Sequence, residues 1–403
     1  MPKILRIVNR FNLGGPTYSA AYLTKHLEDR FEIKLIGGVK DDFEESSEFI
    51  LNELGVSYTL VRSMKREINF KQDRIAYKEI KDIIAEFKPD IVHTHAAKAG
   101  AIGRLAAYRM DVPVIIHTFH GHVFHSYFGK IKTWVYKSVE RYLAKKSSAI
   151  ITLSKKQQHE ICKIHKICDI RKSRIIPLGF DLVRFSQNKN EKRNQFRKRW
   201  MIDDATIAIG IVGRVVPIKN HSLFLDSFLL LKNSTKEKVR GVIIGDGDVS
   251  EDVLTYATHI GLTVSRENSK SPESDIIFTS WIKDISEANA GLDIMALTSL
   301  NEGTPVSLIE AQASNLPVVS TDVGGVRDII IDDKSGFLCQ LGDSLGISNK
   351  LKELVENKEL RYKMGSVGHD YALAKFHYDR FCLEMTKVYT ELLNEFEKNK
   401  KYD

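Results

Sequence analysis

The hydrophobic residues of the first half form short runs that alternate with amphipathic stretches. Apolar runs bounded by turn residues predict buried strands, and a longer apolar periodicity predicts helices. The predicted strands are Ile4–Val8, Glu32–Ile36, Pro89–Thr94, Val112–Phe119, Ala149–Thr152 and Arg174–Pro177, and the predicted helices are Tyr18–Leu27, Lys98–Arg109 and Lys130–Lys146. Strands that alternate with helices predict a parallel sheet with helices on its faces.

The same alternation begins again in the second half. Its predicted strands are Ile207–Val212, Val239–Ile244, Ile276–Phe278, Leu292–Leu297 and Pro317–Ser320, and composition predicts helices from about residue 343 onward. The polar run Gln187–Arg193 suits a domain boundary. We therefore predict two doubly wound α/β domains, residues 1–188 and 200–375. Such sheets bind ligands at the carboxyl ends of their strands, so two sheets that face one another would form an interdomain cleft.

Composition narrows the class of protein. The chain has 403 residues, enough for two domains, and its hydrophobic fraction of 43% permits real cores. It has no apolar run of about 18 residues, which argues against a membrane-spanning helix. The first residues predict a strand and not a signal peptide. The 4 cysteines have neither metal-binding nor disulfide spacing and fit a reducing compartment, so we expect a cytoplasmic protein.

Charge is distributed unevenly along the chain. The net charge is +8, with a basic excess in residues 1–188 and an acidic excess in residues 200–403. A basic domain favours an anionic partner such as membrane lipid or a lipid-diphosphate acceptor, although a solvated face without a partner is the alternative. No RNP or zinc-finger pattern accompanies the charge, so we do not predict nucleic-acid binding. The basic helix Lys130–Lys146 contains Trp134 and Tyr136, which fits either a membrane surface or an ordinary core-facing helix.

Two glutamates flank a turn after the predicted strand Leu292–Leu297. Glu302 follows the strand in a loop, and Glu310 lies in the next helix, for which Thr304 is a suitable cap and Pro305 a suitable first-turn residue. If the helix began at Glu302, the two residues would be about 12 Å apart along its axis. That is near the reach from a sugar across a diphosphate to a ribose. Free N–H groups at the start of the helix would favour an anion between the carboxylates.

Loops after other predicted strands carry glycine and charged residues. Arg214 and Lys219 follow the first strand of the second half and are close enough to converge on one diphosphate. Gly14 and Gly15 follow the first strand of the chain, where the backbone can approach a phosphate or sugar. The triplet Asp246–Asp248 lies in a glycine turn, and we interpret it as structural and predict no metal requirement.

Histidines are concentrated in one part of the first half. Six of the 13 histidines lie between residues 93 and 125: His93, His95, His117, His120, His122 and His125. This density suggests zinc, but no Cys or Glu completes a site at the usual spacing. We expect His93 and His117 to be structural histidines.

The segment Asn301–Ala311 resembles the signature of the retaining glycosyltransferases of family 4, which have the GT-B fold. The resemblance implies that Glu302 contacts the donor sugar, that Glu310 holds the nucleotide ribose, and that Arg214 and Lys219 stabilise the leaving diphosphate. It places His120 beside the reacting sugar. The implied catalytic residues are His120, Arg214, Lys219 and Glu302; the implied donor-binding residues are Gly14, Gly15, Arg214, Lys219, Ile282, Glu302, Gly303, Thr304, Pro305, Val306 and Glu310; the candidate acceptor residues are His95 and His122.

The resemblance extends over most of the chain, with departures at single positions. It implies that a last helix, within residues 376–403, crosses back onto the first domain. Leu178 replaces the family's Asn before a glycine in the interdomain segment, Ser280 replaces a glycine near the nucleotide base, and Asp328 stands where Glu is common. These departures put a hinge hydrogen bond and the base contact in doubt.

The resemblance implies a metal-independent, cofactor-free transferase that uses a nucleotide-diphosphate sugar. UDP is the favoured nucleotide, and N-acetylhexosamine is a candidate sugar. The expected acceptor is a saccharide or a lipid-linked saccharide in surface polysaccharide synthesis, with peripheral contact to the inner face of a membrane through the basic domain. The alternatives are a UDP-sugar epimerase or a sugar phosphorylase of the same architecture, or a non-catalytic subunit that binds nucleotide sugars.

Overall fold

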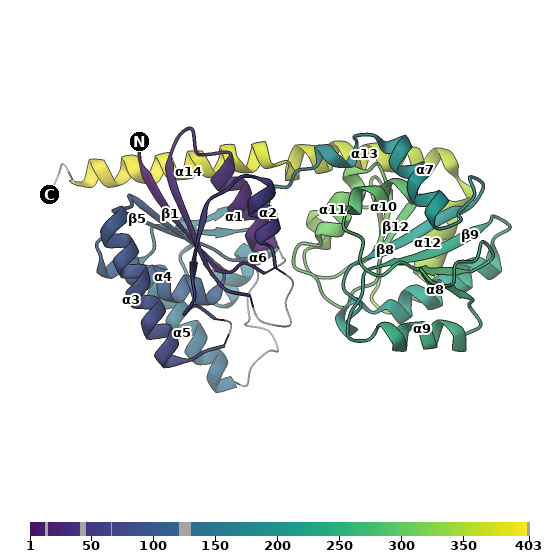
Figure 1. Ribbon diagram of the computed structural model, residues 1–403, viewed down its shortest axis with the longest axis horizontal. Helices are drawn as coiled ribbons and strands as arrows, with labels where there is room; N and C mark the ends of the chain where they lie inside the picture. Colours follow the sequence, from purple (N-terminus) through teal and green to yellow (C-terminus); the bar gives the residue numbers. More distant parts are fainter. Residues whose placement is uncertain (13–14, 41–45, 66, 121–129, 401–403) are drawn as a thin grey trace. The chain divides into compact units, whose positions relative to one another are not determined.

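The protein consists of two α/β units (Figure 1). A computed structural model describes residues 1–12, 15–40, 46–65, 67–120 and 130–400. The first unit comprises Met1–Phe180 and Phe376–Asp403, and the second comprises Asp181–Lys375. In the described part of the chain, each unit contains one seven-stranded parallel sheet.

The first unit has the strand order β3-β2-β1-β4-β5-β6-β7. Its strands are β1 (Lys3–Arg10), β2 (Glu32–Gly38), β3 (Tyr58–Val61), β4 (Ile91–His95), β5 (Val114–Thr118), β6 (Ala149–Thr152) and β7 (Ser173–Ile175). Its helices are α1 (Gly15–Lys25), α2 (Glu48–Glu53), α3 (Phe70–Phe87), α4 (Ala97–Arg109), α5 (Lys130–Lys146), α6 (Lys155–His159) and α14 (Tyr378–Lys400). The direction of winding reverses between β1 and β4, which makes their carboxyl ends a typical ligand position.

Alternate residues of β1 face opposite helical layers. Ile4 packs with Leu23 of α1 and Met385 of α14, and Leu5 packs with Ile80 of α3 on the other face. This alternation follows from the two-residue period of a strand, which points successive side chains to opposite faces. The last helix of the chain therefore contributes to the core of the first unit (Figure 1).

The second unit repeats this topology with the order β10-β11-β9-β8-β12-β13-β14. Its strands are β8 (Ile207–Val212), β9 (Val239–Ile244), β10 (Val264–Ser265), β11 (Ile276–Phe278), β12 (Ile294–Leu297), β13 (Val318–Thr321) and β14 (Gly336–Cys339). Its helices are α7 (Lys189–Arg199), α8 (His221–Ser234), α9 (Ser250–His259), α10 (Ile285–Gly291), α11 (Val306–Ala313), α12 (Ser344–Glu356) and α13 (Lys358–Phe376). Its winding reverses between β8 and β12, so the loops after these strands emerge side by side.

Five short helical segments complete the two units. They are η1 (Glu160–Ile164), η2 (Ile170–Lys172), η3 (Val183–Phe185), η4 (Pro217–Lys219) and η5 (Val326–Asp328). In the described residues, no helix combines the length and apolar character needed to cross a bilayer.

Three strands are absent from the sequence-based prediction: β3, β10 and β14. All three lie at sheet edges, and β10 has only two residues. β3 and β14 have only four residues each, so none of the three contributes a long apolar run. The period-two and apolar-run criteria therefore have little to detect there.

The predicted polar linker Gln187–Arg193 is wrong. Residues Lys189–Arg199 form α7, which packs against α10. Its arginines look like a solvated run in the sequence, but Arg193 and Arg197 both pair with Asp293, at 2.9 and 3.2 Å. The units divide between Phe180 and Asp181, so residues 181–188 belong with the second unit.

Candidate functional site

A lysine and a glutamate from two loops meet at the reversal point of the second sheet. Lys219 Nζ in the loop after β8 lies 2.6 Å from Glu302 Oε1 in the loop after β12. The hydroxyl of Ser299 donates to the same carboxylate oxygen at 2.6 Å. The backbones are joined as well, because the Leu300 N–H donates to the Ile218 carbonyl at 2.8 Å. The sheet thus fixes a cation and a carboxylate where doubly wound sheets bind ligands.

Two glycines let a third loop pack behind Glu302. Gly324, after β13, has a φ of +55°, and a Cβ there would lie 1.7 Å from the carbonyl oxygen of Glu302. The N–H of Gly325 donates to that carbonyl at 3.1 Å. A Cβ at Gly325 would lie 2.0 Å from the carbonyl oxygen of Gly303. This close approach requires glycine at both positions and holds the Glu302–Gly303 backbone in place.

Arg214 supplies a second cation in the loop that carries Lys219. Its side chain is exposed and, among the described residues, forms no hydrogen bond or ion pair. The preceding Gly213 has a φ of +151°, and a Cβ at Gly245 would lie 2.1 Å from the Gly213 carbonyl oxygen. Glycines therefore allow the loops after β8 and β9 to touch. An uncommitted guanidinium at this edge is available for an anion.

Asp246 stabilises the turn after β9. One of its oxygens accepts from the Gly247 N–H at 2.8 Å and from Ser250 Oγ at 2.5 Å, and the other accepts from Ser280 Oγ at 2.7 Å. Partial burial acts to raise the pKa of Asp246, but these hydrogen bonds outweigh it and hold the pKa below its ordinary value. The described residues contain no group of three His, Cys, Asp or Glu side chains suited to hold a metal ion. The contacts of Asp246 are those of a residue that stabilises a turn. That the protein requires no metal remains a prediction.

Ser280 occupies a backbone conformation that favours glycine. Its φ is +56°, in the left-handed region, which explains why a glycine is suited to this position. Its hydroxyl bond to Asp246 compensates by tying the loop after β11 to the loop after β9. Ile282 follows two residues later in the same loop.

The helix after Glu302 begins later than the sequence suggests. α11 starts at Val306, and its cap residue is Pro305, whose ψ of 98° is extended. The prediction that Thr304 caps the helix is wrong, because Pro305 lies outside the helix and itself occupies the cap position. The assumption that one helix spans Glu302 to Glu310 fails for the same reason. Only the path from Val306 to Glu310 is helical, which is about 6 Å.

Glu310 is a largely buried carboxylate with unused hydrogen-bonding capacity. Its side chain is 17% exposed, and Arg184 Nη2 lies 3.7 Å from Oε1, too far for a hydrogen bond. No described residue donates a hydrogen bond to this carboxylate. Burial raises its pKa to about 7, against a smaller lowering effect of Arg184. The free lone pairs could accept hydrogen bonds from ligand hydroxyls.

In the first unit, His95 and His120 form a pair near the carboxyl ends of β4 and β5. His95 Nδ1 lies 2.9 Å from His120 Nε2, and His95 is fully buried. Burial lowers the pKa of His120 to about 3 and holds the pKa of His95 well below its usual range. Both rings are therefore neutral at neutral pH. A neutral imidazole can form a hydrogen bond with a hydroxyl, but it cannot act as a general acid, because it carries no acidic proton to donate.

The other first-unit residues of the prediction have different positions. His93 and His117 are buried and hydrogen bonded, as expected of structural histidines. Gly15 begins α1 directly after the loop that follows β1. Gly14, His122 and His125 lie outside the described residues. Gly15, His95 and His120 belong to the first unit, and all the other predicted site residues that are described belong to the second.

Comparisons with known proteins identify the family. Residues 192–370 match the family described as glycosyl transferases group 1, and residues 13–184 match Glycosyltransferase Family 4. The chain is 30% identical over 340 residues to an Escherichia coli protein, UDP-Gal:alpha-D-GlcNAc-diphosphoundecaprenol alpha-1,3-galactosyltransferase, with 82% of each chain covered. The chain belongs to glycosyltransferase family 4.

Further relatives agree with this assignment. The glycosyltransferase is 25% identical over 340 residues to the capsular polysaccharide biosynthesis glycosyltransferase CapM of Staphylococcus aureus, covering 83% of this chain and 85% of CapM. The crystal structure of Anabaena HepE in complex with UDP matches with a TM-score of 0.79 at 18% identity, covering 96% of this chain and 100% of HepE. The predicted GT-B fold of two Rossmann-like units is confirmed.

Sequence reasoning missed several residues of the glycosyltransferase that position these groups. Ser299 and Arg184 contact the two glutamates, and Arg6 and Tyr389 form a buried network with His93. Arg6 Nη1 donates to Tyr389 Oη at 3.2 Å, and His93 Nδ1 lies 2.7 Å from the same oxygen. Tyr389 comes from α14, far away in sequence, so spacing could not reveal this contact.

The network connects the C-terminal helix to the histidine pair. The His93 ring lies on the His95 ring with centroids 4.2 Å apart, and His93 Nε2 lies 2.8 Å from Thr118 Oγ1. Arg6 is fully buried, and its Nε and Nη2 have no hydrogen-bond partner among the residues that the structure describes. Burial, and to a smaller extent the positive charge of Arg6, lower the pKa of His93 and of His95, so both rings stay neutral.

We expect Tyr389→Phe to lower the stability of the glycosyltransferase by about 1–2 kcal/mol, because it removes a buried hydroxyl from this network. Urea denaturation followed by circular dichroism measures the change. The control Tyr362→Phe, at a side chain that is 69% exposed, should shift stability by less than about 0.5 kcal/mol. Equal midpoints for the two variants would show that the Tyr389 hydroxyl contributes nothing.

Proposed function

We propose that this glycosyltransferase moves a sugar from a UDP-sugar, with retention of anomeric configuration, to a saccharide or lipid-linked acceptor in surface polysaccharide synthesis. One observation carries the proposal. The Lys219–Glu302 pair, at 2.6 Å, sits at the reversal point of the second sheet beside the uncommitted Arg214. This is the arrangement that a leaving diphosphate requires: fixed cations where negative charge develops.

Each group has a distinct role in the proposed transfer. Arg214 and Lys219 bind the diphosphate and stabilise the charge that it gains as the sugar leaves. The first-turn amides of α11 add further donors for the anion. Glu310 accepts hydrogen bonds from the ribose hydroxyls, since its carboxylate has no donor in the described protein. The backbone of Gly303–Val306 lies between these carboxylates and positions the donor sugar.

Glu302 acts in this proposal by positioning and not as a nucleophile. Lys219 and Ser299 both occupy its Oε1, which leaves that oxygen poorly available for attack. Retention is then achieved by departure and attack on one face of an oxocarbenium-like sugar. His120, a neutral imidazole, hydrogen-bonds a sugar hydroxyl, and His95 holds His120 in place near the acceptor. His122 is a further proposed acceptor contact.

The choice of donor and acceptor follows a relative at 30% identity. That protein is named for transfer of galactose from UDP to GlcNAc-diphosphoundecaprenol. We propose a donor of the same class, a UDP-hexose or UDP-N-acetylhexosamine, and an acceptor carried on a lipid diphosphate. The protein would act at the cytoplasmic face of a membrane, with its basic first unit toward anionic lipid.

A turnover assay tests the proposal. UDP-galactose, UDP-glucose and their N-acetylhexosamine counterparts are supplied with a lipid-diphosphate-linked GlcNAc acceptor, and product linkage is read by NMR. We expect acceptor-dependent transfer with retained configuration, at a rate that EDTA leaves unchanged if the enzyme is metal-independent as we propose. Sugar interconversion without acceptor, or transfer to inorganic phosphate, would instead support an epimerase or a phosphorylase.

A further inference from the structure

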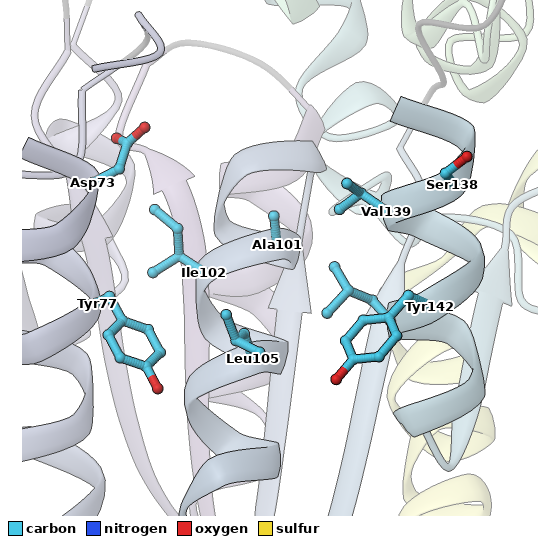
Figure 2. Close-up of a pocket in the computed structure, with 9 residues that line it drawn as sticks. Asp73, Tyr77, Ala101, Ile102, Leu105, Ser138, Val139 and Tyr142 are labelled. Atoms are coloured by element: carbon cyan, nitrogen blue, oxygen red, sulfur yellow. The ribbon is translucent and has the colours of Figure 1, made fainter. Parts of the chain in front are cut away.

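A groove on the first unit has no role in the proposed transfer. It lies between α3, α4 and α5 and encloses about 500 Å³ (Figure 2). Helix α4 forms its floor with Ala101, Ile102 and Leu105, and Tyr77 of α3 faces Tyr142 of α5 across this floor. The lining is almost entirely apolar, which suits a hydrocarbon chain better than a sugar or nucleotide.

An exposed apolar stripe on α5 adjoins the groove. Ile131 is 82% exposed and Trp134 is 67% exposed, and Val135, Val139 and Tyr142 continue the stripe. Each of them lies three or four residues from another member of the stripe, which places them along one side of the helix. Val139 and Tyr142 also line the groove, so stripe and groove form one continuous surface. Contiguous exposed apolar surface of this kind marks an interaction site.

Cations border this surface. Lys146 Nζ lies 2.8 Å from Tyr108 Oη and 5.9 Å from the ring centroid of Tyr142, and Lys81 Nζ lies 6.0 Å from the ring centroid of Tyr77. Both walls of the groove thus carry a lysine one helical turn beyond the tyrosine.

Acidic residues do not cancel this charge on α5. Its one acidic residue, Glu140, is buried and pairs with Arg104 at 2.6 Å. Lys132 and Lys145 are exposed. The helix therefore presents positive charge beside its apolar stripe.

We propose that the face formed by α3, α4 and α5 docks on an anionic phospholipid bilayer, with the α5 stripe in the interface and one acyl chain in the groove. Basic helices with Trp and Tyr on the apolar side lie at such interfaces, where lysines meet lipid phosphates and rings meet acyl chains. The proposal extends the membrane location given above to a specific surface. Its tests use no sugar donor, so failure of the transfer proposal would leave them intact.

Vesicle sedimentation tests the surface. We expect binding to phosphatidylcholine vesicles that contain phosphatidylglycerol, little binding to pure phosphatidylcholine, and marked weakening at high salt. Trp134→Asp should weaken binding at least tenfold. The matched control Tyr362→Asp changes a side chain of the second unit that is also exposed, 69%, and should leave binding unchanged. Undiminished binding by Trp134→Asp, or equal binding to both vesicle types, would overturn the proposal.

A second measurement tests the groove. Titration with dodecyl phosphate below its micelle concentration should show binding to the native protein, and inorganic phosphate should show none. Ala101→Phe fills the floor and should weaken dodecyl phosphate binding at least tenfold with an unchanged melting curve; Ser138→Phe at the rim is a second filling variant if the first does not fold. If a folded variant with a filled groove binds dodecyl phosphate as tightly as the native protein does, the alkyl chain binds elsewhere and the groove assignment is overturned.

The same face could instead join two copies of the protein. Sedimentation velocity of the native protein and Trp134→Asp distinguishes this outcome. We expect both to be the same species in the absence of lipid. A native dimer that Trp134→Asp dissociates would assign the surface to a second copy and contradict lipid docking.

Discussion

Replacing Glu302 with glutamine is expected to lower kcat/KM by roughly 100- to 1,000-fold, which corresponds to about 3–4 kcal/mol of lost transition-state stabilisation. The carboxylate holds Lys219 at 2.6 Å and accepts the Ser299 hydroxyl at the same oxygen. An amide cannot neutralise Lys219, so the ammonium would be free to leave the position that faces the diphosphate. Steady-state assays with a saturating acceptor measure this loss.

The control for this variant is Glu353→Gln. Glu353 also pairs with a lysine, Lys350 at 3.2 Å, but on an exposed part of α12. We expect this variant to retain nearly full activity, since exposed pairs contribute little. A Glu302→Gln enzyme that is folded and keeps more than about a third of native activity would contradict the role of the pair.

Replacing Glu310 with glutamine is expected to stabilise the protein at alkaline pH. The pKa of Glu310 is about 7 in the folded state against an ordinary value of 4.5. A raised pKa in an acid means that ionisation opposes folding. The native protein therefore has its full stability below pH 4.5 and loses this contribution as the pH rises through about 7. Ionised Glu310 therefore lowers the free energy of unfolding at pH 8 by about 3 kcal/mol, and glutamine, which does not ionise, avoids this loss.

Thermal melting at several pH values measures this effect. The melting temperature of Glu310→Gln should exceed that of the native protein by roughly 5–10 °C at pH 8 and by little at pH 5, given about 2–4 °C per kcal/mol in a domain of this size. Glu353→Gln again serves as the control, with no pH-dependent difference. A difference that does not change with pH would show that Glu310 ionises normally.

The same variant should bind UDP more weakly. Ribose hydroxyls that donate to the ionised carboxylate would lower its pKa, so UDP binding near pH 7 should release protons from the native protein. Calorimetry in buffers of different ionisation enthalpy measures this release. Glu310→Gln should bind at least about tenfold more weakly, with no release, because a charged hydrogen bond is lost.

Most of the sheet architecture can be predicted from the sequence, because central strands are buried on both faces. β8, β9 and β11 match their predicted bounds, and α5 does as well. The missing strands are edge strands, for which the apolar pattern is short. The prediction of a linker at residues 187–193 was wrong for another reason. The one arginine of this segment, Arg193, pairs with Asp293, about one hundred residues away, and local composition cannot show such pairing.

The charged members of the candidate site are also predictable, but the groups that orient them are not. Arg214, Lys219, Glu302 and Glu310 stand out because they follow strands in the sequence. Ser299 and Arg184 carry no distinguishing pattern, and only the fold brings them to the glutamates. The predicted start of α11 was too early because Pro305 adopts an extended conformation, and the sequence alone does not distinguish a proline in the first turn from one just before it.

The central claim is that Arg214 and Lys219 bind the diphosphate of the donor. Calorimetric titration of UDP and of uridine into the native protein and into an Arg214→Met/Lys219→Met variant tests it directly. We expect the variant to lose about 100-fold or more in UDP affinity, at roughly 1.5–3 kcal/mol for each charged contact, and to bind uridine as the native protein does. Unchanged UDP affinity in a folded variant would contradict this claim.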